Sequence, residues 1–235
     1  MRNLGVALLI SSTIACGGSN PPSPSAPSTP TPPSNRSPTI TSVTVTPASG
    51  VSGLTSFSMS GTATDADNDP LTYQWSFGGT TATAIGPTVA ATLTGDGDVA
   101  IRLTVTDGKG GTATDLRSVV IGTMTGRWSL LFNNNACGAV VAPVMTLTQF
   151  TGGVVTGTME SPANWCNVRA GTPGKLDPAA PASIDSQGNF TGARLKVEGF
   201  LDVFLTGKMD GTGRTVTGTS RATNGQINPF TLRKL

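Results

Sequence analysis

The chain has 235 residues, of which 30 are Gly and 17 are Pro, with 12% charged residues, three cysteines and no histidine. The absence of histidine excludes a Ser-His-Asp triad, a Cys-His dyad and any histidine metal site. The formal net charge of +2 is small for a protein that binds nucleic acid, so we expect no nucleic-acid partner.

The first sixteen residues have the pattern of an export signal. A short positive start is followed by an apolar run from Leu4 to Ala15, which is too short to span a bilayer. The sequence Thr13-Ile14-Ala15-Cys16 that ends this run resembles a bacterial lipoprotein signal. The resemblance implies that Cys16 is acylated and anchors the protein to a membrane. Gly17 stands where an inner-membrane retention Asp is common, which implies the outer membrane or the cell surface. The alternative is an ordinary secretory signal that is cut nearby.

Residues 17–38 form a Pro/Ser-rich segment, in which eight of the twenty residues from 19 to 38 are proline. Proline fixes φ and removes a hydrogen-bond donor, so the segment cannot form a helix or a central strand. We expect a disordered linker with polyproline character, which at about 3.1 Å per residue could reach roughly 60 Å.

Residues 39–122 predict an immunoglobulin-like (Ig-like) β-sandwich. Apolar and polar residues alternate in the runs 43–45, 57–63, 71–77 and 101–105, and glycine-rich and Asp-rich turns separate the runs. Six or seven such strands in about 85 residues are typical of a sandwich. In this fold Trp75 would be a core residue between the two sheets.

Two motifs in this region carry a family resemblance. They are Asp65-Ala66-Asp67-Asn68-Asp69-Pro70-Leu71-Thr72-Tyr73-Gln74-Trp75 and Leu103-Thr104-Val105-Thr106-Asp107-Gly108-Lys109-Gly110-Gly111. Together they resemble a PKD domain or a close cadherin-like relative, although Gly78-Gly79-Thr80 stands where such domains often have an acidic turn. The resemblance implies an extracellular spacer or an adhesion or glycan-associated module, and only rarely a catalytic domain.

Three carboxylates occur on alternate residues of one loop, at Asp65, Asp67 and Asp69, and Asp107 could join them from a neighbouring loop. Calcium takes six to eight oxygen ligands, so these four residues are candidate calcium ligands. The EF-hand loop is absent, because no Gly and Glu follow at its required offsets. The alternative is a solvated turn, since Asp and Asn favour turns through local hydrogen bonds.

Residues 123–235 predict a small antiparallel β-barrel. A strand, a turn with glycine and a second strand recur at 147–158, 184–192 and 205–219, and each copy has a further glycine that we expect at a bulge or bend. The first strand, near Trp128, and the last, near Phe230, could pair and close the sheet. Roughly eight strands are expected, and the pattern resembles lipocalin-like domains of bacterial lipoproteins. Residues 164–181 are predicted to form a long loop.

Cys137 and Cys166 are the cysteines that remain beside Cys16. In an exported chain the simplest interpretation is one disulfide between them. It would close a loop of about 30 residues and stabilise the fold by roughly 3–4 kcal/mol. A reactive thiol pair is the alternative, but no Cys-x-x-Cys spacing supports it.

The interior of the barrel allows two interpretations. An eight-stranded barrel is filled by side chains or holds one small ligand. A pocket or a packed core could be formed by Trp128, Leu130 and Phe132 on the first strand together with the apolar run 200–205. We favour the packed core. The alternative function is a carrier or sensor of a small apolar ligand.

Motifs of common enzymes are missing from the sequence, including the Gly-x-Ser-x-Gly elbow, Ser-x-x-Lys and the Walker loop. Residues 38–122 carry seven acidic and three basic residues, whereas 123–235 carry six acidic and ten basic residues. We therefore predict an all-β, non-enzymatic, lipid-anchored cell-envelope protein. Its modules would bind a polysaccharide or another envelope protein, and calcium is the one cofactor under consideration.

Overall fold

The computed structural model describes residues 34–78, 82–132, 142–161 and 168–235. Cys16, Cys137 and Cys166 lie outside the described residues, so their predicted acylation and disulfide stay predictions. Residues Asn35–Leu235 group into one unit by their contacts. Within the described residues, no helix has the length and apolar character needed to cross a membrane.

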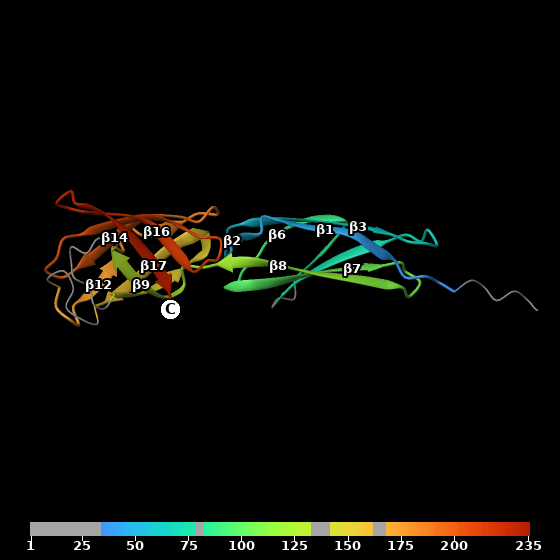
Figure 1. The fold of residues 1–235 in the computed structure, drawn as a ribbon, viewed down its shortest axis with the longest axis horizontal. Helices are drawn as coiled ribbons and strands as arrows, with labels where there is room; N and C mark the ends of the chain where they lie inside the picture. Colours follow the sequence, from blue (N-terminus) through green and yellow to red (C-terminus); the bar gives the residue numbers. More distant parts are fainter. Residues whose placement is uncertain (1–33, 79–81, 133–141, 162–167) are drawn as a thin grey trace, which may run out of the picture. The chain divides into compact units, whose positions relative to one another are not determined.

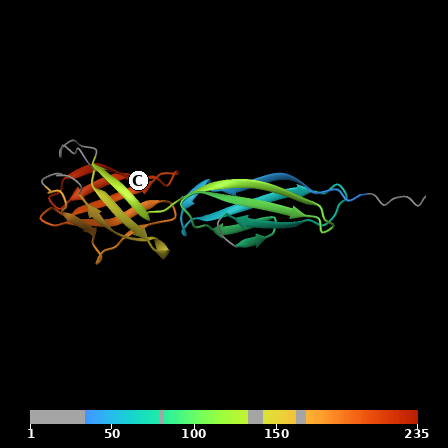
Figure 2. The same cartoon turned by 90° about the horizontal axis from the view of Figure 1, so that it is seen from below.

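The predicted sandwich is present as two facing β-sheets (Figures 1 and 2). The first sheet is antiparallel and has the order β1 (Thr39–Thr46), β3 (Ser56–Thr64), β6 (Thr88–Thr92). In the second sheet β2 runs parallel to β8 and the other neighbours are antiparallel. Its order is β2 (Ser49–Val51), β8 (Thr112–Gly122), β7 (Gly97–Thr106), β4 (Thr72–Phe77), β5 (Thr83–Ile85).

The core of the sandwich follows the period-two pattern of the sequence. Side chains alternate between the two faces of a strand, so the large apolar residues of β3, β4 and β7 point between the sheets. Phe57, Trp75 and Leu103 are fully buried there. The indole Nε1 of Trp75 donates a hydrogen bond to the Gly86 carbonyl at 3.0 Å. Burial of the ring therefore leaves no indole donor unsatisfied.

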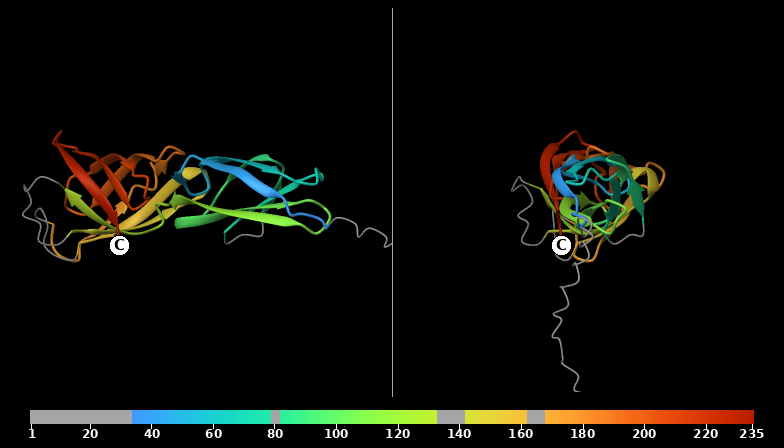
Figure 3. Two further views of the ribbon diagram at one scale, coloured as in Figure 1. Left: turned by 45° about the vertical axis from the view of Figure 1, so that its right-hand side comes forward. Right: turned by 90° about the vertical axis from the view of Figure 1, so that its right-hand side faces the viewer.

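The C-terminal strands close into an antiparallel barrel of eight positions (Figure 3). The first and last strands pair as predicted, with Leu130 opposite Leu232. Two short strands, β12 and β13, share one position between β11 and β14. The strands are β9 (Gly126–Phe132), β10 (Val144–Gln149), β11 (Val154–Glu160), β12 (Pro173–Leu176), β13 (Ala182–Ile184), β14 (Asn189–Val197), β15 (Val203–Met209), β16 (Thr215–Ala222) and β17 (Ile227–Lys234); the 3-10 turn η2 (Thr151–Gly153) joins β10 to β11.

One row of inward-facing residues shows how the barrel is filled. Phe190, Gly207, Gly218 and Phe230 are successive cross-strand partners on β14, β15, β16 and β17. Both phenylalanines are buried. A Cβ on Gly207 would lie 3.1 Å from the ring of Phe230. Gly207 therefore leaves room for the ring of Phe230, which fits the large-and-small alternation that small barrels use.

Two expectations about the barrel need correction. Residues 164–181 are not wholly a loop, because β12 pairs with β11 and β14 within this stretch. Pro173 is compatible with a strand because it is the first residue of that strand. Gly192 lies at the predicted bulge, where the pairing of β14 shifts register. Gly207 and Gly218 lie in regular register instead, so neither forms a bulge; Gly207 makes space for the Phe230 ring, and Gly218 lies close to the backbone of β15.

Candidate functional site

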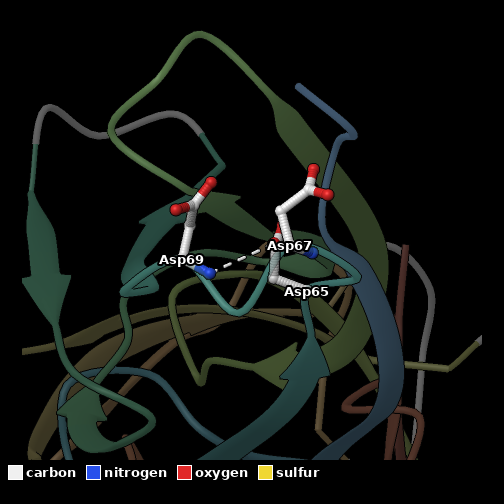
Figure 4. A group of neighbouring side chains, drawn as sticks. All are labelled: Asp65, Asp67 and Asp69. Carbon is white, nitrogen blue, oxygen red and sulfur yellow. Dashed lines mark hydrogen bonds between the residues drawn. The ribbon is translucent and has the colours of Figure 1, made fainter. Parts of the chain in front are cut away.

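The loop from Asp65 to Asp69 joins β3 to β4 and carries the three alternate carboxylates. Asp65 shapes the loop, because its Oδ1 accepts hydrogen bonds from the backbone amides of Asp67 at 2.8 Å and Asp69 at 3.2 Å. Asn68 adopts a positive φ of 59°, which Asn tolerates better than most residues. The carboxylates of Asp67 and Asp69 consequently project to the same side of the loop (Figure 4).

The structure brings together three of the four predicted metal ligands. One carboxylate oxygen from each of Asp65, Asp67 and Asp69 lies within 4.8 Å of the others. Oxygens that share one calcium ion at 2.3–2.6 Å can be at most about 5 Å apart, so the spacing fits this ion. Oδ2 of Asp65 and Oδ2 of Asp69 are buried without a hydrogen-bond partner among the described residues. Buried carboxylate oxygens are costly unless a cation or a donor satisfies them.

Two cationic side chains of the protein partly neutralise the loop. Arg36 binds Asp67 through its Nε at 3.0 Å, its Nη2 at 2.7 Å and its backbone amide at 2.8 Å. Lys109 Nζ lies 2.5 Å from Oδ1 of Asp69, whose side chain is only 7% exposed. The hydrogen bond from Arg36 lowers the pKa of Asp67, and the hydrogen bond to Asp69 raises the pKa of Lys109. Asp67 and Lys109 therefore stay charged at neutral pH.

Asp107 lies outside the group of three within the described part of the chain. Its Oδ1 accepts hydrogen bonds from the backbone amides of Lys109 at 2.7 Å and Gly111 at 2.9 Å. Its Oδ2 accepts one from Asn35 Nδ2 at 2.7 Å, and this bond is the first cause of the lowered pKa of Asp107. Asp107 therefore ties the loop between β7 and β8 to the start of the folded region.

Sequence reasoning missed the roles of Asn35 and Arg36, because both lie in the segment assigned to the linker by its proline content. They bind Asp107 and Asp67, more than 30 residues away in the sequence. The signal that could have found Arg36 is its charge, since it is the single charged residue between Cys16 and Asp65.

The interior of the barrel is filled by apolar side chains in the described residues. Trp128, Phe190 and Leu205 are fully buried, and their neighbours in this core are exposed by at most 6%. A void large enough for a ligand would leave accessible surface on the side chains that line it. The indole Nε1 of Trp128 donates to the Met124 carbonyl at 2.9 Å. These observations fit the packed core that we favoured over a pocket.

Residues 35–121 match the family model of the PKD domain. The match covers the sandwich and agrees with the two motifs at 65–75 and 103–111. The match begins at Asn35, the residue that binds Asp107.

Comparison with curated proteins found no match. One solved structure, from work on the promiscuous specificity of carbohydrate-binding modules of the β-sandwich superfamily, aligns with this chain at 15% identity. The alignment covers 86% of this chain and 94% of that one, with a TM-score of 0.37. This likeness is too weak to assign a fold or a ligand to the chain.

Proposed function

We propose that this protein is a non-enzymatic, lipid-anchored cell-envelope protein that presents binding or adhesion modules outside the membrane. The match of residues 35–121 to the PKD domain is the observation that carries the proposal. Domains of this kind usually act as extracellular spacers or as adhesion and glycan-associated modules, and the matched family is not a family of enzymes. The polysaccharide is the partner class we favour, with an envelope protein as the alternative.

Cys16 is the proposed site of the lipid anchor. Its acylation is supported by the signal pattern that precedes it, and the Pro-rich segment after it would separate the folded region from the membrane. We expect an alkyne-tagged palmitate fed to the producing bacterium to label the wild type and to leave Cys16→Ala unlabelled. Equal labelling of both chains, or none of the wild type, would contradict the anchor.

The polysaccharide partner can be tested directly with the full-length chain in detergent. Electrophoresis through gels that contain a neutral or an acidic polysaccharide should retard the chain in at least one of them, relative to a gel without polysaccharide. The same mobility in every gel would remove polysaccharides as partners and leave the envelope protein.

We propose that the loop of Asp65, Asp67 and Asp69 binds calcium. The buried Oδ2 atoms of Asp65 and Asp69 support this proposal, because they are hard ligands that no donor of the described residues reaches. The region has four carboxylates, Asp65, Asp67, Asp69 and Asp107. Among the described residues, the positively charged side chains bonded to them are Arg36 and Lys109. A divalent cation would balance the remaining charge.

The calcium proposal is tested by the thermal unfolding of the sandwich with calcium and with a chelator. Saturating calcium should stabilise the wild type, by about 2.7 kcal/mol when free calcium is 100 times the Kd. Asp69→Asn should lose the response. The matched control is Asp115→Asn, which removes a carboxylate bound to Arg117 elsewhere in the sandwich and should keep the response. A wild type that does not respond to millimolar calcium would leave the loop as a solvated turn.

A further inference from the structure

A row of four outward-facing side chains crosses the barrel at one end. Arg194 on β14, Phe204 on β15, Arg221 on β16 and Ile227 on β17 are successive cross-strand partners. Neighbouring strands are about 4.8 Å apart, so each of these side chains lies next to the side chain on the adjacent strand. Phe204 is 41% exposed and Ile227 63% exposed, which is unusual for large apolar side chains.

Phe204 is held on one side by a fixed guanidinium. The Cζ of Arg194 lies 5.7 Å from the centroid of the Phe204 ring, within the range of a cation–π contact. Arg194 is itself bound to Asp202, with its Nε 2.9 Å from Oδ2, and to Asp177 at 3.3 Å. Because both carboxylates bind Arg194, its charge is already matched. Its role at this surface is to orient the aromatic ring.

The other side of Phe204 borders a surface hollow of about 410 Å³. Its rim is a hairpin turn with a fixed backbone. The amide of Thr223 donates to the Asp202 carbonyl at 3.1 Å, and the amide of Gly225 donates to the Ala222 carbonyl at 2.9 Å. Arg194 does not line the hollow. The lining residues are Phe204, Arg221, Ala222, Thr223 and Gly225.

Arg221 is the charged group that the hollow offers to a ligand. Within the part of the chain that the structure describes, its guanidinium has neither a hydrogen bond nor an ion pair. The acidic groups nearby are already used, since Asp202 binds Arg194, and Asp177 binds Arg194 and Lys196. Residues 123–235 as a whole carry ten basic and six acidic residues. The charge that complements this surface is therefore negative.

We propose that this hollow binds an acidic sugar unit of a polysaccharide. The carboxylate of the sugar would pair with the fork of Arg221, which matches a planar carboxylate with two parallel hydrogen bonds. The C–H face of the sugar ring would lie on Phe204, whose π face is negative and attracts the positive C–H edges. Thr223 would supply a hydroxyl at the rim. This inference rests on the proposed function as a glycan-binding module and names its ligand class.

An aromatic side chain beside an unpaired arginine distinguishes this ligand from simpler anions. An isolated inorganic anion would need the arginine alone, and its binding would not depend on Phe204. A neutral sugar would need the ring alone, and would leave Arg221 without a partner. The combination of both groups in one hollow favours a ligand that has an apolar face and an anionic group, and an acidic sugar has both.

The test compares polygalacturonate with its fully methyl-esterified form, which has the same sugar and linkage without the charge. The full-length chain in detergent is run through gels that contain either polymer. The wild type should be retarded by polygalacturonate, and much less by the ester. Phe204→Ala and Arg221→Ala should each weaken the binding about tenfold. The control is Arg233→Ala. Arg233 is exposed and has no partner among the described residues, and it lies about 20 Å from Ile227 along β17.

The outcomes separate this inference from the proposed function. Equal weakening by Arg233→Ala and Arg221→Ala, with no effect of Phe204→Ala, would mean diffuse attraction to a polyanion and would overturn the site. Retardation by polysaccharide that is unchanged in both variants would also overturn the site, while the glycan-binding function would stand. Absence of binding to neutral and acidic polysaccharides alike would overturn both. Unchanged thermal unfolding of the variants would exclude loss of fold as the cause.

Discussion

Acidic side chains have different surroundings in the sandwich and in the barrel. In the sandwich, Asp65 and Asp69 each keep one buried carboxylate oxygen without a partner. In the barrel, Asp185 and Asp210 accept hydrogen bonds from their own turns, and Asp177 binds Arg194 and Lys196. Among the described residues, the sandwich thus has carboxylate oxygens without a hydrogen-bond donor, whereas the barrel has an arginine, Arg221, without an acidic partner.

This difference shows that one architecture can carry two opposite surfaces. Both regions are mainly antiparallel β-structures rich in Thr and Gly, and among the described residues each buries a tryptophan whose indole donates to a backbone carbonyl. Their cores are alike, so the strands do not determine the ligand. The loops and the outward-facing positions differ instead, and our two proposals place a cation at the sandwich and an anion at the barrel on that basis.

The largest effect is expected when either buried tryptophan is removed. Trp75→Ala and Trp128→Ala should each lower the free energy of unfolding of their own region by about 3–5 kcal/mol, because both rings are fully buried. Urea unfolding measures the loss, and hydrogen exchange locates it. Exchange should rise in β4 and β7 for the first variant, and in β9 and β17 for the second. If one variant loosened both cores equally, the two regions could not be treated as separate.

Adding a methyl group to a closely packed strand glycine should destabilise the barrel at Gly218 more than the sandwich at Gly61. A Cβ on Gly218 would lie 2.0 Å from the backbone oxygen of Thr206, which cannot move without breaking the strand pairing. A Cβ on Gly61 would meet the terminal carbon of Leu103 at 2.5 Å, and this side chain can rotate. Gly218→Ala should cost about 3 kcal/mol or more, and Gly61→Ala clearly less. Equal losses in thermal unfolding would contradict this explanation of the barrel glycines.

Acid should weaken the barrel through Asp177, whose pKa is lowered first by its hydrogen bond with Lys196. A carboxylate with a lowered folded-state pKa stabilises the fold above its ordinary pKa of about 4, and this contribution is lost as the pH falls further. Asp177→Asn should therefore be less stable than the wild type at neutral pH, and the difference should shrink below about pH 4. Thermal unfolding against pH measures this, and a constant difference would contradict it.

The sandwich should lose stability over the same pH range for a related reason. The pKa of Asp67 and the pKa of Asp107 are both lowered, by Arg36 and Asn35 respectively. Asp177→Asn should leave the acid response of the sandwich unchanged. Comparing the pH dependence of unfolding of the wild type and of this variant therefore distinguishes the contribution of the barrel from that of the sandwich.

Much of the fold could be predicted from local patterns. The alternation near Trp75 and Leu103 follows from the geometry of a strand with one buried face, and it needs no knowledge of distant residues. The pairing of the first and last barrel strands was also predictable, because pairing them removes the exposed edges of the sheet. The strand at Pro173 was missed, since its short length and its proline hide it until β11 and β14 lie on either side.

The candidate sites were only partly predictable. Asp65, Asp67 and Asp69 are close in the sequence, so a turn was enough to bring them together. Phe204 was predicted to line a pocket or to belong to the core. The run 200–205 is apolar at successive positions, however, so at least one of its apolar side chains had to face outward. Its position beside Arg194 and Arg221 depends on strand register, which local sequence does not specify.

The sequence by itself determined the strand pattern, the two cores and the acidic loop, because each depends on the spacing of residues along one segment. Only the tertiary structure decided which charges meet. It placed Asn35 and Arg36 on the loops of Asp107 and Asp67, and it left Arg221 without a carboxylate partner among the described residues. Ion pairs and surface hollows form between segments that are far apart in the chain, and their free energy depends on distances that only the packed fold sets.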